Sequence, residues 1–124
     1  MTKGTKTMKV DSDSFSQIGG CTQGESFWLS SNATYPFYRI IVSSDGITLK
    51  KNQPWVSFFT VRSEDFFFKR PQITRIKRIK RLFDYSGIQI DHSITGYPPR
   101  IIFWTFGYSE LRKHLEEYGY TVSE

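Results

Sequence analysis

Hydrophobic and polar residues alternate along this chain in short runs, and glycine, proline, asparagine and aspartate separate one run from the next. Alternation with a period of two is typical of strands that have one buried face. The pattern predicts about seven short strands rather than βαβ units. In chain order they are residues 35–43, 47–50, 55–61, 65–70, 73–82, 86–92 and 100–106.

Turn residues and prolines set the boundaries of these predicted strands. Pro36 indicates that the first strand begins at the edge of a sheet, because proline cannot donate a ladder hydrogen bond. The turn Ser44-Asp45-Gly46 predicts a hairpin between the first two strands.

The last two strands have the densest apolar content. Ile88, Ile90 and His92 share one face of their strand. Residues 100–106 are apolar at nearly every position, and a strand that is apolar on both faces is usually covered on both. We expect a barrel interior on one side of it and a helix on the other.

One amphipathic helix is predicted directly after that strand. Leu111, Leu115 and Tyr118 form an apolar stripe at helical spacing. Ser109 is the expected N-cap, and Gly119 suits the left-handed residue that ends a helix. Such a short helix is marginal alone, so we expect it to dock on the aromatic strand.

The 124 residues are enough for one domain. Residues 1–26 are rich in serine, threonine, glycine and lysine and are predicted to be a disordered or loosely attached tail, which leaves residues 27–124 as the domain. No apolar run is long enough to span a membrane, and no apolar core follows the first lysines, so we expect a cytoplasmic protein. The single cysteine, Cys21, is expected to be an exposed thiol.

The strongest charge feature is a run of basic residues without any acid, called here the basic run (residues 69–81). The rest of the chain has ten basic and 12 acidic residues, so the net charge of +5 comes entirely from this run. A concentrated field of this kind can steer an anionic partner. The candidate anion-binding residues are Lys69, Arg70, Arg75, Lys77, Arg78, Lys80 and Arg81.

The apolar residues inside the basic run recur every three positions, at Ile73, Ile76, Ile79 and Leu82. This spacing drifts around a helix, whereas a strand with one bulge accommodates it, so a bulged strand is predicted. A second interpretation of the charges remains open: the lysines and arginines of a solvated strand also discourage edge-to-edge pairing.

Catalysis and metal binding find no support in the sequence. His92 and His114 are the only histidines, they lie on separate predicted elements, and no cysteine cluster exists. No nucleophile elbow, zinc-protease motif or glycine-rich nucleotide loop occurs. We therefore predict a protein that is not an enzyme and that uses neither a cofactor nor a metal.

Five segments of the chain combine turn residues with strand-like runs. They are Asn32-Ala33-Thr34-Tyr35-Pro36-Phe37, Ser44-Asp45-Gly46-Ile47-Thr48-Leu49, Phe67-Phe68-Lys69-Arg70-Pro71-Gln72-Ile73-Thr74-Arg75-Ile76, Gly87-Ile88-Gln89-Ile90-Asp91-His92 and Ile102-Phe103-Trp104-Thr105-Phe106. Together they resemble a family of uncharacterised bacterial proteins with a pleckstrin-homology-like (PH-like) domain, and the resemblance covers about residues 28–122.

The resemblance implies a mainly β (α+β) fold, in which a bent antiparallel barrel or sandwich of seven strands is capped by one C-terminal helix. It implies no catalytic residue. In the wider superfamily this fold binds lipid head groups or peptides or mediates self-assembly, so the resemblance also allows a homo-oligomer.

The first functional hypothesis is a non-enzymatic binding or scaffold module in the bacterial cytoplasm, peripheral to the inner membrane if its partner is lipid. The basic run would engage anionic lipid head groups or an acidic protein. The alternative is weak, sequence-independent binding of nucleic acid by the same run, with Tyr85 and Tyr97 as stacking residues. Nucleic acid is the weaker hypothesis, because most aromatic residues fall at positions expected to lie in the core.

Overall fold

The computed structural model describes residues 14–24, 30–52, 65–80 and 85–124. The predicted strand 55–61 lies outside these residues, and so do Arg81 and Leu82 of the predicted strand 73–82.

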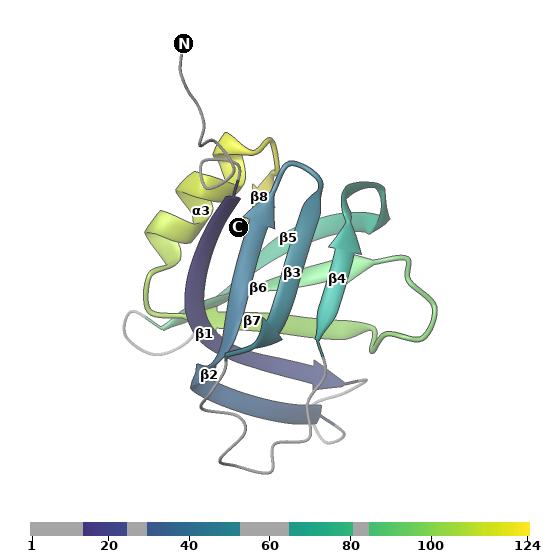
Figure 1. Ribbon diagram of the computed structural model, residues 1–124, viewed down its shortest axis with the longest axis vertical. Coiled ribbons are helices and arrows are strands. Elements are labelled where there is room, and N and C mark those ends of the chain that lie inside the picture. The colour runs from purple at the N-terminus through teal and green to yellow at the C-terminus, as the bar shows by residue number, and fades with distance from the viewer. Residues whose placement is uncertain (1–13, 25–29, 53–64, 81–84) are drawn as a thin grey trace.

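The described residues form a mostly β structure with one sheet of eight strands and one C-terminal α-helix (Figure 1). The sheet order is β4-β3-β2-β1-β7-β6-β5-β8. All neighbouring pairs are antiparallel except β5 with β8, which is parallel. The elements are β1 (Ser14–Gly24), β2 (Ser30–Ser43), β3 (Gly46–Lys51), β4 (Phe66–Lys69), the 3-10 helix η1 (Arg70–Gln72), β5 (Ile73–Lys80), β6 (Ser86–His92), β7 (Arg100–Thr105), α3 (Tyr108–Glu117) and β8 (Val122–Ser123).

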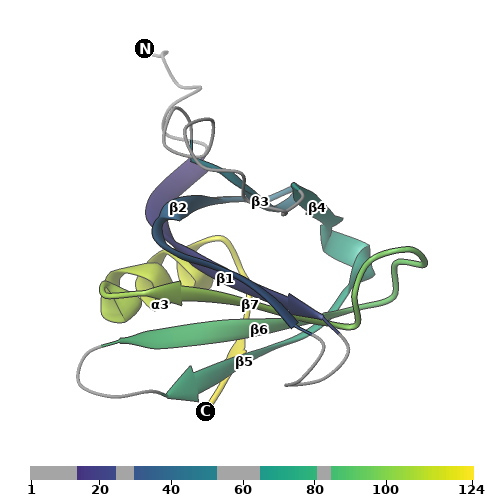
Figure 2. The same ribbon diagram turned by 90° about the horizontal axis from the view of Figure 1, so that it is seen from below.

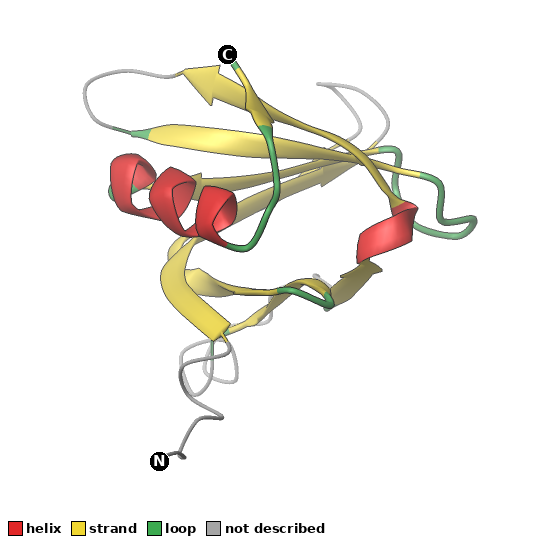
Figure 3. Cartoon of the chain, turned by 90° about the horizontal axis from the view of Figure 1, so that it is seen from above, coloured by secondary structure: helices red, strands yellow, loops and turns green. Residues whose placement is uncertain are grey.

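The sheet curls over on itself, so that β2, β3 and β4 face β7, β6 and β5 across the interior (Figure 2). Helix α3 lies along one open side, and η1 lies at the opposite side, where the chain passes from β4 to β5 (Figure 3). In the part of the chain that the structure describes, β4 and β8 end the sheet order and do not pair with each other. The prediction of a mainly β fold with a C-terminal helix is confirmed, whereas the structure does not support a closed barrel.

Strand β1 corrects the prediction of an N-terminal tail through residue 26. Residues 14–24 pair with β2 along almost their whole length, and residues 20–24 also pair with β7. β1 therefore joins the two halves of the curled sheet. Its serines, glycines and glutamines have weak strand propensity, and tertiary pairing overrides that propensity here.

The expectation that Pro36 marks a sheet edge is also wrong, because β2 begins at Ser30 and lies between β1 and β3. Gly19 pairs with Tyr38 and Cys21 with Ala33, so four residues of β2 stand opposite Gly20 alone. Pro36 is one of these four, and a bulge is a place where proline needs no ladder partner. The predicted hairpin at residues 44–46 is confirmed by the pairing of Val42 with Ile47.

The core lies between the halves of the sheet and α3. Ile101 and Phe103 of β7 share it with Leu111 and Leu115 of α3, all fully buried. The helix therefore covers the same face of β7 as the core, which corrects the expectation of a helix on one face and a barrel interior on the other. Trp104 lies on the opposite face of β7. There it donates a hydrogen bond from Nε1 to Thr22 Oγ1 (2.9 Å) and stacks on Tyr85.

The predicted apolar stripe of α3 is confirmed for Leu111 and Leu115, which are buried, whereas Tyr118 is the C-cap and is only partly buried. The predicted N-cap is wrong. The N-cap is Gly107 rather than Ser109, and Ser109 lies inside the first turn. Gly119 has a φ of 90° and ends the helix as predicted. None of the helices among the described residues is long and apolar enough to cross a membrane.

Cys21 is buried rather than exposed, because it lies on the central strand β1 instead of in a tail. Burial raises the pKa of its thiol to about 12. The reactive thiolate is therefore suppressed in the folded protein.

Candidate functional site

The basic run begins at the end of β4, passes through η1 and continues along β5. The predicted bulged strand is confirmed for residues 73–80: Ile73 pairs with His92 and Arg75 with Asp91, so Thr74 is the extra residue. The bulge resets the alternation and lets both Ile73 and Ile76 face the core side.

The alternation of β5 divides its cations between two faces. Arg75 and Lys77 point away from the core, on the face of their partners Asp91 and Gln89. Arg78 and Lys80 follow Ile76 on the other face. The cations therefore surround the C-terminal half of β5 instead of forming one flat patch.

Arg70 has a structural role. Its Nη1 donates to the carbonyl oxygen of Tyr118 (2.8 Å) and to that of Ser44 (3.1 Å), and its guanidinium lies over the Tyr120 ring, 4.4 Å from the centroid. It thus ties the β2–β3 turn to the C-terminal end of α3.

Arg78 also belongs to the fold. It donates from Nη1 to Glu124 Oε1 (3.1 Å), and its guanidinium lies over the Tyr108 ring, 4.2 Å from the centroid. Glu124 also bonds Arg112 and the hydroxyl of Tyr108. The hydrogen bond from Arg78 is the main reason why the pKa of Glu124 is lower than its ordinary value of 4.5, while burial raises the pKa of Tyr108.

The lowered pKa of Glu124 predicts an acid dependence of stability. Because the folded protein binds this proton more weakly than the unfolded chain, the carboxylate stabilises the fold above pH 4.5, and this is lost as the pH falls through the lowered pKa. We expect Glu124→Gln to unfold at lower urea concentration than the parent at neutral pH, with the difference shrinking in acid. Urea titrations across the acid range measure this, and a difference that stays constant into strong acid would contradict it.

The lysines of the basic run differ from its arginines. Lys69, Lys77 and Lys80 are exposed, and none has an ion-pair partner among the described residues. Arg75 is half exposed but pairs with Asp91 (Nε to Oδ2, 3.1 Å). The charge available to a partner is therefore carried mainly by the lysines; Arg81 lies outside the described residues.

A pocket of about 240 Å³ lies beside the bulge, between residues 73–76 and residues 119–121. Arg70 and Arg75 both line it. Each guanidinium has N–H groups beyond those in the bonds given above, so the pocket offers donors to a small anion. The pocket depends on residues 119–121, which the sequence does not connect with the basic run.

The histidines have structural partners. His92 accepts from the Ile94 N–H at Nδ1 (3.0 Å) and so donates from Nε2 to the Pro98 oxygen (2.9 Å). His114 stacks on Phe15 and contacts Glu117. Nowhere in the described residues do three histidine, cysteine, aspartate or glutamate side chains gather as metal ligands would.

The aromatic residues proposed for base stacking are largely packed. Tyr97 contacts Phe66 and Phe68, and its hydroxyl bonds both backbone polar groups of Phe67 at the edge of β4. Tyr85 packs on Trp104. These contacts remove both tyrosines as free stacking platforms.

Sequence reasoning missed a second pocket, at the junction of β1, β2 and β7. Its volume is about 360 Å³, and residues 16–18, Tyr35, Arg39 and residues 105–107 line it. Residues 16–18 lie in the segment that the sequence predicts to be a tail, so the sequence alone does not indicate this site. We call it the Arg39 pocket.

No protein-family model matches the sequence, and a search of curated proteins finds no significant match. The described residues define the class of protein by structure: a mainly β domain with an open, curled sheet, one C-terminal helix and a strand rich in cations.

Proposed function

We propose that this protein is a cytoplasmic, non-enzymatic binding module with a PH-like fold, which attaches to an anionic membrane surface through β5 and the adjacent residue Lys69. The proposal rests on one observation: the exposed lysines of this segment have no ion-pair partner among the described residues, whereas the ion pairs of Arg75 and Arg78 balance those two charges.

The type of cation favours a diffuse surface over one tightly held anion. An arginine makes two-pronged, directional bonds, whereas a lysine acts as a mobile point charge. The arginines of β5 already bond Asp91 and Glu124, which leaves lysines on both faces of the strand. Such lysines suit a layer of lipid head groups, and each contributes about 1 kcal/mol near an anionic membrane.

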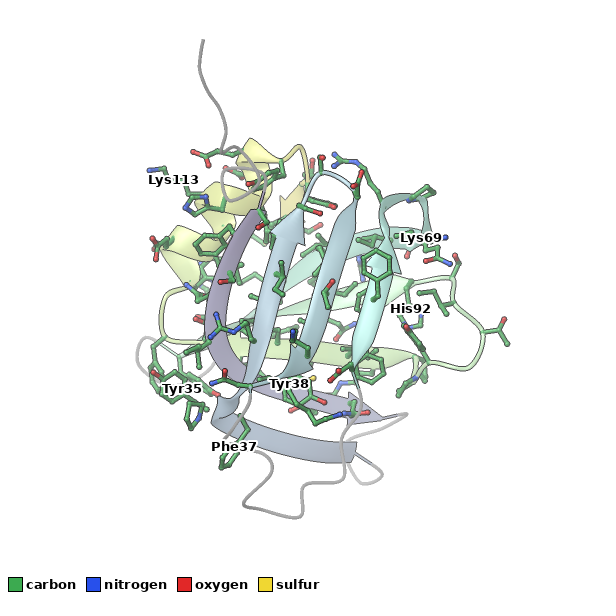
Figure 4. The ribbon with its side chains drawn as sticks, in the orientation of Figure 1. Tyr35, Phe37, Tyr38, Lys69, His92 and Lys113 are labelled. Atoms are coloured by element: carbon green, nitrogen blue, oxygen red, sulfur yellow. The ribbon has the colours of Figure 1, made fainter. Side chains whose placement is uncertain are left out.

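Single-stranded nucleic acid is the less favoured partner, because it needs stacking aromatic side chains beside the cations. Three large hydrophobic side chains are exposed among the described residues, and only Phe67 of β4 lies beside the basic run, two residues before Lys69. The other two, Tyr35 and Phe106, contact each other at the Arg39 pocket. Tyr35 and Lys69 lie on opposite sides of the molecule (Figure 4).

We expect Lys77→Glu/Lys80→Glu to weaken binding to vesicles that contain anionic phospholipid by at least about thirtyfold, because two contributions of about 1 kcal/mol are removed and repulsion is added. Both side chains are exposed, so the fold should persist. Co-sedimentation with vesicles across a salt series measures the effect. Vesicles of neutral lipid should retain neither protein.

The matched control is Lys50→Glu/Lys113→Glu, which changes the net charge equally at exposed lysines on β3 and α3. It should keep most of the binding. Equal loss of vesicle binding in both variants would show that only the net charge matters. Full vesicle binding by the β5 variant would show that these lysines are solvated and do not contact the membrane. Binding of an acidic polypeptide or of oligothymidylate, without binding of anionic vesicles, would replace lipid as the partner.

A further inference from the structure

The Arg39 pocket brings a cation and two exposed aromatic rings together at a bend of the sheet. Up to Gly19, β1 pairs only with β2, and from Gly20 onward it also pairs with β7. The pocket opens where β1 separates from the end of β7, which continues through residues 105–107 into α3.

The wall formed by β1 and β7 is fixed by a set of hydrogen bonds. Gln17 accepts from Thr105 Oγ1 (2.7 Å) and donates from Nε2 to the Gly107 oxygen (3.0 Å), while Thr105 Oγ1 also accepts from the Gly107 N–H (2.9 Å). A Cβ added at Gly107 would lie 2.7 Å from Gln17 Nε2, so a larger residue there would push the Gln17 amide out of these bonds. This wall is therefore built in advance of any ligand.

The Arg39 guanidinium is held in place by hydrogen bonds to neutral side chains. Its Nη1 donates to Ser16 Oγ (3.1 Å) and its Nη2 to Asn52 Oδ1 (3.4 Å). Asn52 is buried, and it is anchored in turn by a bond from Nδ2 to the Pro36 oxygen (2.9 Å). Both acceptors on Arg39 are neutral, and no carboxylate pairs with it in the described part of the chain. Its remaining N–H groups are free to meet an anion.

The apolar side of the pocket is formed by Tyr35 and Phe106. Their side chains are 49% and 60% exposed, and their rings meet edge to face with centroids 5.5 Å apart. Two rings at right angles leave a corner into which a flat apolar group can pack. Large aromatic side chains this exposed on a small domain indicate a contact surface.

We propose that the Arg39 pocket binds a small aromatic carboxylate, with the carboxylate on the Arg39 guanidinium and the ring in the corner between Tyr35 and Phe106. A guanidinium matches a carboxylate with two parallel hydrogen bonds, and the volume of about 360 Å³ suits a ligand with one ring. This site is separate from the basic run, so it makes the protein a receptor for a soluble acid in addition to a module for anionic surfaces.

The test uses the full chain and two-dimensional amide NMR with benzoate as the probe. Benzoate should shift the amide signals of residues 16–18 and 105–107. Benzamide, which lacks the charge, and acetate, which lacks the ring, should each bind about tenfold more weakly or worse. Equal affinity for benzoate and acetate, or no shift of those amides at millimolar benzoate, would overturn the proposal.

Two variants locate the binding energy. Arg39→Gln should weaken benzoate about tenfold or more, while Lys50→Gln should leave the affinity almost unchanged. Lys50 is the matched control because it is the cross-strand partner of Arg39 and does not line the pocket. Equal losses in both variants would mean general attraction by positive charge and would overturn the site.

Arg39 also bonds Asn52, so a second variant covers the case in which Arg39→Gln does not fold. Phe106→Ala removes a side chain that is mostly exposed, and it should weaken benzoate several-fold without weakening acetate. A Phe106→Ala protein that binds benzoate as tightly as the parent would contradict the proposed position of the ring.

Discussion

Replacing Phe103 with alanine is expected to lower the free energy of unfolding by about 3–5 kcal/mol, the largest effect of any single truncation considered for this protein. Phe103 is fully buried, is paired with Ile88 across β6 and β7, and shares the core with Leu111 of α3. The cavity would therefore lie where the sheet meets the helix. Urea denaturation followed by circular dichroism measures the loss.

Phe106→Ala is the matched control, because it removes the same ring three positions later. That side chain is 60% exposed, and its contacts are with the rings of Tyr35 and Tyr85, so we expect a loss of about 1 kcal/mol or less. If Phe103→Ala does not fold, Phe103→Leu should still cost more than Phe106→Ala. Similar losses for both phenylalanines would contradict the assignment of the core to the Phe103 face.

This pair of phenylalanines shows what the hydrophobic pattern of the chain predicts and what it leaves open. The strand, its alternation and the helix that follows it were all readable from residues 100–118, because the apolar residues recur at the period of each element. The exposure of Phe106 was not readable, since it depends on where the strand ends and the chain turns at Gly107. Local spacing also placed the helix cap two residues too late.

The failure at β1 has a different physical cause. The segment SFSQIGGCTQG owes its strand structure to partners far along the chain, with β2 on one side and β7 on the other. Its own propensities favour a loop, and no local pattern encodes a partner some eighty residues away. The Arg39 pocket was missed for the same reason, because its three segments are brought together only by this pairing.

The basic run was predicted less completely than residues 100–118 but better than β1. Its strand and bulge followed from the spacing of the isoleucines. The separate roles of its cations did not, because Arg70 and Arg78 bond groups contributed by the last residues of the chain, around α3 and Glu124. Sequence treats seven cations alike, whereas the structure separates arginines that hold the fold from lysines that face solvent.

Gly19→Ala is expected to destabilise the protein by about 3 kcal/mol or more, because a methyl group has no space at this position. An added Cβ would collide with the carbonyl oxygen of Trp104 and would lie 2.6 Å from Cζ of Phe103. Gly19 is the last residue of β1 before the strand begins to pair with β7, so the close approach of the two strands depends on the missing side chain. Thermal and urea unfolding measure the loss.

Two further variants identify the cause of this loss. Ser14→Ala, at the exposed start of β1, should change stability by no more than about 0.5 kcal/mol. Adding Phe103→Leu to Gly19→Ala removes the ring atom from the collision but leaves the carbonyl of Trp104 in place. The double variant should therefore remain far less stable than Phe103→Leu alone. Recovery to the stability of Phe103→Leu would show that the ring, rather than the backbone of β7, requires glycine at position 19. A Gly19→Ala protein as stable as the parent would contradict the close approach of β1 and β7.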